Sequence, residues 1–243
     1  MSLNRVIDRY LAFGLGCMIV GAPFAAFSWF ILRDTALTAL GLACAVLGAT
    51  VALVPNSPVP KQTVRSMVEG SCVNVEALLE ELDVKSKALY LPPRDGRVYV
   101  YAPLRENVSD EVLAWVVNAP TRVVTDVGGV RGVMLFPPGS EVVRLSLIGE
   151  ESGIEEALSY VLVDTLEAVD GVKAVRAGDR VVVQILKPRM ETGFPRFRKV
   201  LGSLPVSVAG CVLAAVLKQP VLYEGEEGLG STLNATFRVI KAG

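Results

Sequence analysis

The segment from Tyr10 to Val54 reads YLAFGLGCMIVGAPFAAFSWFILRDTALTALGLACAVLGATVALV, and its only charged residues are Arg33 and Asp34. These two residues divide it into two uncharged runs, 10–32 and 35–54. An apolar helix of about 20 residues spans a bilayer, and a charge at its centre costs about 2.5–3.5 kcal/mol on insertion scales. The segment therefore predicts a transmembrane helical hairpin with its turn at Arg33-Asp34.

Small residues recur every four positions in the second run, as Gly41, Ala45 and Ala49 and again as Gly48 and Ala52. Small side chains at this spacing allow two membrane helices to approach closely. They predict transmembrane packing either within the hairpin or between protomers. Because neither run contains Asp, Glu, Lys, Arg or His, a transport or proton path through the hairpin is disfavoured.

Basic residues flank the hairpin on both outer sides, with Arg5 and Arg9 before it and Lys61 and Arg65 after it. The positive-inside rule then predicts a two-span protein of the cell membrane with both termini in the cytoplasm, residues 1–9 being the N-terminal part. A cleaved signal peptide is the alternative for the first run. Its length and the second run directly after it disfavour that alternative.

The rest of the chain predicts a cytoplasmic α+β domain of helices layered on antiparallel β-hairpins. A proline-rich linker, 55–62, leads into a first half, 63–149, and a second half, 150–243. Each half shows the order helix, two strands, helix, two strands. The halves are therefore two candidate αββαββ pseudo-repeats, although any αββ unit shares this rhythm.

Local patterns predict the individual elements of the domain. The first half has helices at 64–82, broken at Gly70-Ser71, and 109–117, and strands at 88–91, 97–102, 122–125 and 132–136, with a type I turn at 93–96. The second half has helices at 152–169 and 203–217, and strands at 173–176, 180–186, 221–224 and 232–240, with a turn at 224–230. The last hairpin is expected to expose strand edges for pairing. The uncharged stretch 201–217 predicts a buried domain helix, with a third membrane span as the alternative.

Composition argues against several kinds of chemistry. The chain has no histidine, which excludes Ser-His-Asp and Cys-His nucleophile systems and histidine-based zinc sites. Its cysteines stand singly, at Cys17, Cys44, Cys72 and Cys211. No metal, cofactor or catalytic residue is indicated, so the sequence favours a non-enzymatic protein. After residue 54 it has 21 basic and 23 acidic residues, which disfavours general nucleic-acid binding.

A basic segment, 187–199, is the most conspicuous local charge cluster, and Phe194 and Phe197 lie within it. Cations interleaved with aromatic rings suit anionic lipid headgroups, RNA or a phosphorylated ligand. A solvated loop between a strand and a helix is the alternative. The candidate residues for anionic ligand or lipid contact are Lys187, Arg189, Arg196, Arg198 and Lys199.

Several segments, taken together, resemble uncharacterised archaeal membrane proteins with a short N-terminal hairpin and a soluble α/β domain. The segments are Gly70-Ser71-Cys72-Val73-Asn74, Leu135–Ser140, Ala157–Val163, Val200-Leu201-Gly202-Ser203 and Lys218-Gln219-Pro220-Val221. The resemblance implies archaeal membrane residence and supplies no activity. The valine-rich, histidine-free composition is compatible with a thermophile.

The leading hypothesis is a membrane-anchored scaffold or adaptor whose cytoplasmic domain binds a protein partner or assembles with itself as a homo-oligomer. The alternative is a domain that handles lipids or phosphate ligands, enzymatically or not, through the basic segment. Docking to ribosomes at the membrane through the same cations is a third, weaker hypothesis. The expected partners are thus membrane lipids and a protein.

Overall fold

The computed structural model describes residues 9–53, 61–146, 153–189 and 193–241, which form two compact units. The first unit ends at Val64 and the second begins at Arg65, within helix α3 (Lys61–Glu81). Most of the linker predicted at 55–62 lies outside the described residues.

The first unit is a helical hairpin of α1 (Arg9–Phe27), a π-helical turn η1 (Ser28–Leu32) and α2 (Thr35–Leu53). Arg33 adopts the left-handed conformation, with φ of 51°, where the chain reverses. Asp34 then caps α2, because its Oδ1 accepts hydrogen bonds from the N–H groups of Ala36 (2.8 Å) and Leu37 (3.2 Å). The two charges that divide the apolar segment thus form its turn.

Small residues lie between α1 and α2, and large apolar side chains point outward. A Cβ atom on Gly48 would lie 2.6 Å from the carbonyl oxygen of Gly14, so the two backbones are nearly in contact. Of the predicted packing residues, Gly41 and Gly48 are buried and Ala45, Ala49 and Ala52 are half-buried. Phe13, Ile19 and Phe30 are 60%, 69% and 77% exposed. Water disfavours such a surface and lipid favours it, so the N-terminal helices associate with a membrane.

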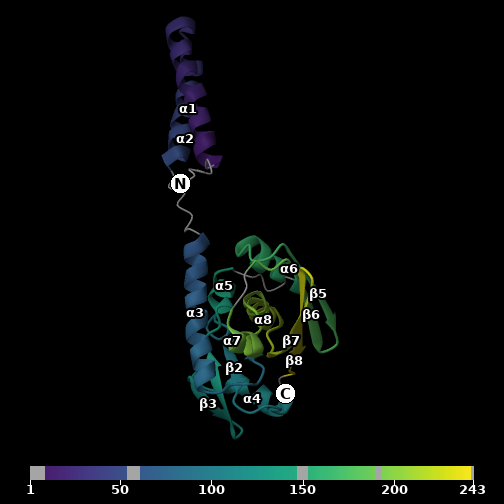
Figure 1. Ribbon diagram of the computed structural model, residues 1–243. Helices are drawn as coiled ribbons and strands as arrows, with labels where there is room; N and C mark the ends of the chain where they lie inside the picture. The colour runs from purple at the N-terminus through teal and green to yellow at the C-terminus, as the bar shows by residue number, and fades with distance from the viewer. Residues whose placement is uncertain (1–8, 54–60, 147–152, 190–192, 242–243) are drawn as a thin grey trace. The chain divides into compact units, whose positions relative to one another are not determined.

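The second unit is built on one antiparallel sheet with the strand order β3-β4-β2-β1-β7-β8-β6-β5. The strands are β1 (Leu89–Tyr90), β2 (Val100–Pro103), β3 (Val124–Val127), β4 (Val130–Leu135), β5 (Gly171–Ala177), β6 (Arg180–Leu186), β7 (Val221–Leu229) and β8 (Thr232–Val239). The domain is therefore α+β, and its two halves share a single sheet (Figure 1).

Helices cover the two faces of this sheet unequally. The larger core joins one sheet face to α3, α5 (Gly139–Leu145), α6 (Ile154–Ser159) with its π-helical continuation η3 (Tyr160–Thr165), α7 (Pro195–Leu201) and α8 (Leu204–Leu217). A smaller core joins the opposite face to α4 (Asp110–Trp115) and the 3-10 turn η2 (Val116–Asn118). This second core includes Leu89, Tyr101 and Met134 of the first half. On that face, Arg180 and Val182 of β6 remain exposed.

Helix α8 lies at the centre of the larger core (Figure 1). Among the described residues, three helical stretches are long and apolar enough to cross a membrane: 12–32, 35–52 and 195–217. Their most apolar windows are 17%, 11% and 83% buried, respectively. Residues 204–214 are all buried, and Gly210 lets the Tyr90 ring approach so closely that a Cβ would lie 2.7 Å from it. The third stretch is thus enclosed by protein, as the buried-helix prediction expects.

The last hairpin lies inside the strand order, and the prediction that it exposes strand edges holds only for part of β7. Strand β8 pairs with β7 on one side and β6 on the other, whereas β1 pairs only with Val221 and Leu222 of β7. The rest of β7 has no paired strand on that side within the described residues. The edges are β3 and β5. The short pairing with β1 was missed because local sequence shows which strands form a hairpin but not which distant strand pairs with its other side.

The structure also differs from several predictions made from local sequence. Helix α3 runs unbroken past Gly70, since an exposed glycine costs a helix only about 1 kcal/mol. The turn at Asp95-Gly96 has positive φ at both residues (51° and 74°), which is the type I′ pattern and not type I. The predicted turn at 224–230 instead continues β7 to Leu229. Helix α5, which follows Pro137-Pro138, was not predicted.

Candidate interaction site

The cations at the start of the basic segment are paired with one carboxylate. Asp170 Oδ2 lies 3.2 Å from Lys187 Nζ, and its Oδ1 lies 2.6 Å from Arg189 Nη2. Hydrogen bonds from Arg189 and Lys187 lower the pKa of Asp170. The pairing joins the chain after β6 to the residue just before β5.

The end of the basic segment is helix α7, so the alternative of a loop between a strand and a helix applies only to the described residues before Pro195. Its first turn is capped by the buried carboxylate of Glu76 in α3, whose oxygens accept the N–H groups of Arg196 (2.9 Å) and Phe197 (2.5 Å). Phe197 is fully buried and Phe194 packs partly buried on the core, so neither ring is free to stack with a ligand. The tertiary cap explains why a short helix forms here.

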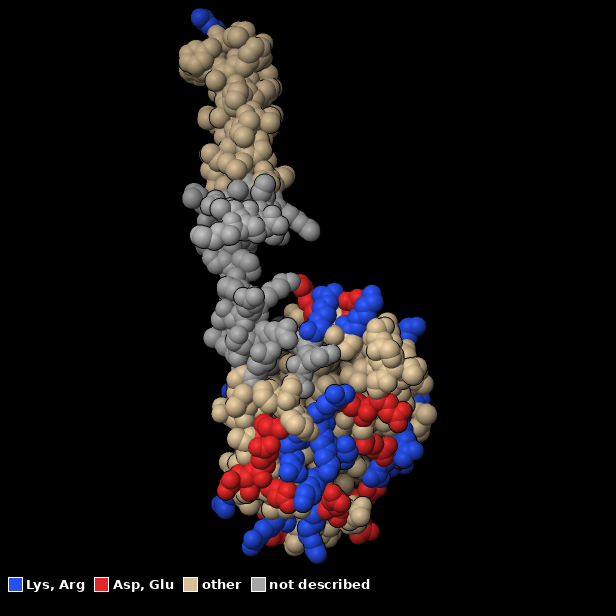
Figure 2. Space-filling model, viewed as in Figure 1, with Lys and Arg blue, Asp and Glu red and all other residues tan. Residues whose placement is uncertain are grey.

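Four of the five predicted contact residues have acidic partners. Besides the two on Asp170, Arg196 lies 3.4 Å from Asp83, and Arg198 lies 2.5 Å from Glu226, whose side chain is only 5% exposed. Glu226 also accepts the N–H of Ser203 at 2.8 Å. Lys199 is exposed and has no ion pair within the described ranges. Figure 2 shows Lys and Arg side chains interleaved with Asp and Glu on one face of the domain.

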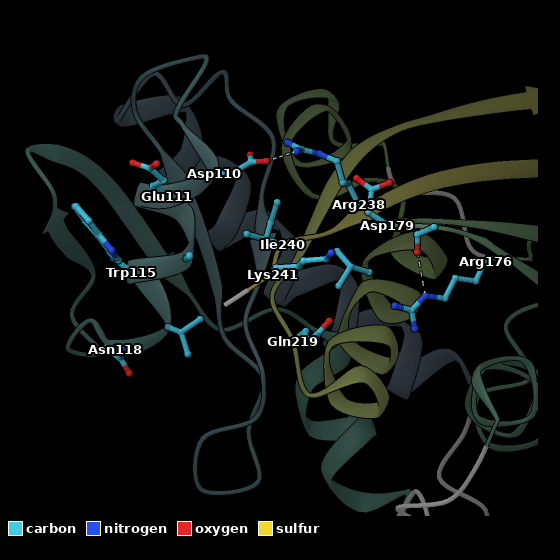
Figure 3. Close-up of a pocket in the computed structure, with 14 residues that line it drawn as sticks. Asp110, Glu111, Trp115, Asn118, Arg176, Asp179, Gln219, Arg238, Ile240 and Lys241 are labelled. Atoms are coloured by element: carbon cyan, nitrogen blue, oxygen red, sulfur yellow. Dashed lines mark hydrogen bonds and ion pairs between the residues drawn. The ribbon is translucent and has the colours of Figure 1, made fainter. Parts of the chain in front are cut away.

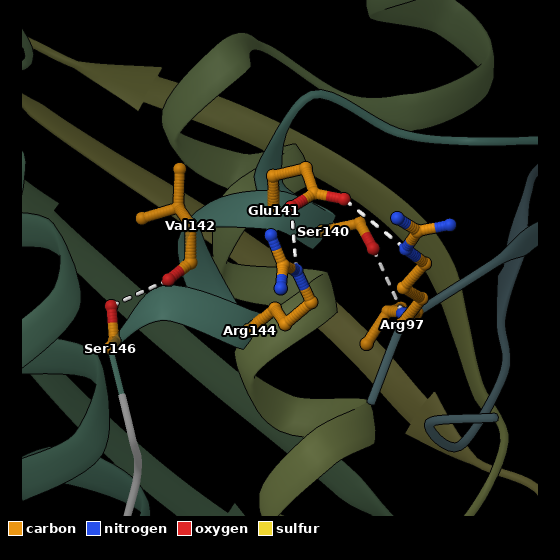
Figure 4. Close-up of polar contacts among 7 residues, drawn as sticks. Arg97, Ser140, Glu141, Val142, Arg144 and Ser146 are labelled. Atoms are coloured by element: carbon orange, nitrogen blue, oxygen red, sulfur yellow. Dashed lines mark hydrogen bonds and ion pairs between the residues drawn. The ribbon is translucent and has the colours of Figure 1, made fainter. Parts of the chain in front are cut away.

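Two buried residues with reactive side-chain groups, Ser140 and Cys211, lie in surroundings that favour a structural role. The Ser140 hydroxyl is buried and accepts the N–H of Val98 at 2.9 Å, while neighbouring Glu141 bridges Arg97 and Arg144 (Figure 4). Burial raises the pKa of the Cys211 thiol, which disfavours a reactive thiolate. The part of the chain that the structure describes contains no cluster of three or more potential metal ligands.

An open recess of about 1300 Å³ lies where α4 faces the end of β8 and the β5–β6 turn. We call it the α4 recess. Its charged and aromatic lining consists of Asp110, Glu111 and Trp115 from α4, Arg176 and Asp179 from the β5–β6 hairpin, and Arg238 and Lys241 at the end of the chain. Figure 3 shows Trp115 on the α4 side and Arg176 and Asp179 on the other side.

Arg238 joins the two sides of the α4 recess. Its Nη1 lies 2.5 Å from Asp110 Oδ2 in α4, and its Nε lies 3.3 Å from Glu224 Oε1 in β7 (Figure 3 shows the first pair). The hydrogen bond with Asp110 raises the pKa of Arg238. The guanidinium thus holds α4 to the exposed part of the sheet.

Trp115 is the large apolar side chain of the recess, and it is 58% exposed. Its ring lies over Gly128 in the β3–β4 turn, where a Cβ would come within 3.1 Å of a ring carbon. Because Gly128 has φ of 58° and carries no side chain, the indole has a flat surface on which to rest. An exposed but supported tryptophan is typical of protein-binding surfaces.

Comparison with protein families matches residues 3–238 to the domain of unknown function DUF7982. The chain belongs to this family. The DUF7982 match includes both the apolar hairpin and the sheet domain, up to the penultimate residue of β8. Comparison with curated proteins and with solved structures gave no match.

Sequence reasoning did not single out the α4 recess of this DUF7982 protein. One signal was present in α4: Leu113 and Val116 lie three residues apart and are buried, whereas Trp115 falls off that stripe. The other lining residues come from segments up to 131 positions away, Asp110 to Lys241, so no local pattern connects them.

Proposed function

We propose that this DUF7982 protein is a membrane-anchored, non-enzymatic module that binds a protein partner through the α4 recess. The observation that carries the proposal is the supported, exposed Trp115 beside a recess of about 1300 Å³. Tryptophan and arginine are the residues most enriched at energetic centres of protein interfaces. The α4 recess contains two such arginines, Arg176 and Arg238, beside its tryptophan.

The charges of the recess favour a protein over a polyanion. Three carboxylates, Asp110, Glu111 and Asp179, stand against three cations, Arg176, Arg238 and Lys241. A nucleic acid or an anionic membrane surface would be repelled by the first set as strongly as it is attracted by the second. A protein surface with both signs of charge suits the arrangement.

The hairpin supports a two-span anchor with both termini in the cytoplasm. Small residues are enclosed between α1 and α2, large apolar ones point outward, and basic residues flank the hairpin on both outer sides. A domain so tethered meets its partner at the membrane surface, where tethering raises the effective concentration of both proteins.

The strand order supports an origin of the domain by duplication. In the first half the order is β3-β4-β2-β1, and in the second half it is β7-β8-β6-β5. Counting strands from the start of each half, both read third, fourth, second, first. An αββ rhythm alone does not require this shared order. The helices differ, since α4 covers the face opposite the one that α8 covers.

Site-specific photocrosslinking in native membranes tests the partner proposal. A benzoylphenylalanine in place of Trp115 should capture one discrete protein, whereas the same group in place of Leu145 should not. Leu145 is a suitable control because it is 68% exposed and does not line the recess. A product of twice the chain mass would identify a second copy as the occupant.

Identical products at both positions, or none at position 115, would contradict the proposal. A second readout is co-purification of the captured protein after mild detergent extraction. Trp115→Ala should reduce the recovered amount at least several-fold, because an exposed interface tryptophan contributes about 2 kcal/mol or more.

The phosphate- or lipid-handling alternative through the basic segment is less favoured, as is ribosome docking. Four of its five cations already have carboxylate partners, so a ligand would have to displace Asp170, Asp83 or Glu226. Replacing Arg196 and Arg198 with Glu, with Lys199 left in place, is the direct test. Loss of anionic-lipid binding or of ribosome association would restore the corresponding alternative.

A further inference from the structure

A second cavity, of about 400 Å³, lies on the domain apart from the α4 recess except for the shared Arg238. We call it the lysine cavity. Its walls come from the chain before β1, the loop after β2, the end of α7, and strands β7 and β8. These segments converge only through the tertiary fold.

The lining of the lysine cavity is strongly cationic. Glu106 is its single carboxylate, against five cations: Lys85, Lys87, Arg105, Lys199 and Arg238. Lys85 is paired with Asp83 at 2.7 Å, and Arg238 is paired with Asp110 and Glu224. Lys87, Arg105 and Lys199 have no carboxylate within 4.0 Å among the described residues. Glu226 acts on Lys87, and Asp83 on Lys199, only through longer-range attraction, so a ligand would not have to break an ion pair of these three cations among the described residues.

Lys87 is held in a position that a nearby anion would stabilise. Its Nζ donates to the carbonyl oxygen of Lys199 at 2.9 Å and lies 4.8 Å from the centre of the Tyr223 ring. Burial, and then the charge of Lys199, lower the pKa of Lys87, and the charge of Glu226 offsets this only in part. An ammonium group fixed in a half-buried wall beside a second cation is costly, and a bound anion would offset that cost.

We propose that the lysine cavity binds a small phosphate-bearing ligand. Arg105 offers a planar fork of N–H donors suited to two phosphate oxygens, while Lys87 and Lys199 act as point charges. The side-chain amide of Asn107 in the same wall offers further donors. The volume fits a compact phosphorylated molecule or the headgroup of an anionic lipid. The lining of this site does not include Trp115, and its only residue shared with the α4 recess is Arg238.

Calorimetric titration of the full-length protein in phosphatidylcholine nanodiscs tests the proposal, with inorganic pyrophosphate as the probe. Saturable binding is expected. The variant Arg105→Gln/Lys199→Gln should weaken it by about tenfold or more, because it removes two positive charges and their charge-assisted hydrogen bonds to phosphate. Both residues are exposed, so the fold should be retained, as an unchanged circular dichroism spectrum would verify.

A matched control is Arg131→Gln/Lys173→Gln, which removes the same charge from two exposed positions outside the lysine cavity. It should leave pyrophosphate affinity within about twofold. Equal weakening by both double variants would show diffuse attraction to surface charge and overturn the proposal, as would the absence of saturable binding.

A second titration distinguishes the two sources of phosphate. Water-soluble dihexanoyl phosphatidylglycerol carries the lipid headgroup without a bilayer. If it binds more tightly than pyrophosphate, and with the same dependence on Arg105 and Lys199, the ligand is a lipid headgroup. The reverse order identifies a soluble phosphate compound.

Discussion

Tyr101 illustrates how a single buried side chain depends on its neighbours. Its hydroxyl donates to the carbonyl oxygen of Val130 at 3.0 Å, and its ring lies against Gly132, where a Cβ would be 2.3 Å away. Burial, and then the charge of Asp126, raise the pKa of Tyr101 to about 12. The tyrosine thus stays neutral in the folded domain at pH values where an unfolded chain would ionise.

Alkaline pH should therefore destabilise the domain. Below about pH 10, the ordinary pKa of tyrosine, Tyr101 is neutral in both states and its contribution is fully present. Between pH 10 and 12 only the unfolded state loses the proton, so the free energy of unfolding should fall. In Tyr101→Phe, urea unfolding should show a smaller fall over this interval, after a loss of about 1 kcal/mol at pH 7 for the hydrogen bond. An unchanged alkaline slope would contradict the assignment.

Glu76 is buried, and its carboxylate accepts hydrogen bonds from two backbone N–H groups at the start of α7. Glu76→Gln leaves one oxygen for the two N–H groups of Arg196 and Phe197, so it should lower the free energy of unfolding by about 1–3 kcal/mol. Urea unfolding monitored by circular dichroism measures this change. Glu80→Gln, at an exposed position of the same helix, should change it by less than about 0.5 kcal/mol. Equal effects would rule out a special role for Glu76.

At the scale of elements, the close packing of α1 against α2 follows from the glycines and alanines between them. Gly48→Leu should separate α1 from α2, since even a Cβ there would lie 2.6 Å from the Gly14 carbonyl oxygen. The midpoint of thermal unfolding in detergent should fall by several degrees. Val46→Leu, which enlarges a 62% exposed side chain of the same helix, should leave the midpoint unchanged. A neutral Gly48→Leu would mean that the helices do not pack through this face.

Elements with strong local signals were predictable, and those made by distant contacts were not. Helix α8 begins at Leu204 after Ser203, with proline in its first turn, close to the predicted 203–217. Helix α7 was not predicted within the basic segment, because its cap, Glu76, is 120 residues away from Arg196. Strand β7 was cut short in prediction at 224, since the acidic residue Glu226 finds Arg198 and Ser203 only in the folded domain.

At the scale of the whole molecule, the two units should be separable. A fragment of residues 61–243 should fold and remain soluble without detergent, because α8 is already enclosed by the domain and the membrane-associated helices are removed. A cooperative thermal transition and a monodisperse elution profile would verify this. Aggregation relieved only by detergent would indicate that the stretch 195–217 enters the membrane.

The residues of the two candidate sites could be predicted only in part from the sequence. Lys199 was among the predicted contact residues and lines the lysine cavity, whereas Arg105 and Lys87 carried no local signal. Trp115 carried a weak one, as an aromatic residue beside a buried helical stripe. Neither cavity follows from a motif, because each is assembled from segments of both halves of the domain.

The amino-acid order alone specified the apolar hairpin, its charged turn and the lack of histidine chemistry, because hydrophobic run length and composition are local properties. It also specified the α+β class, through short-range periodicity. Tertiary structure decided that β7 and β8 lie inside the strand order, which cations are neutralised, and where Trp115 and the lysine cavity face solvent. Those outcomes depend on contacts between residues tens to more than a hundred positions apart, and such contacts form only when the sheet and its helices assemble together.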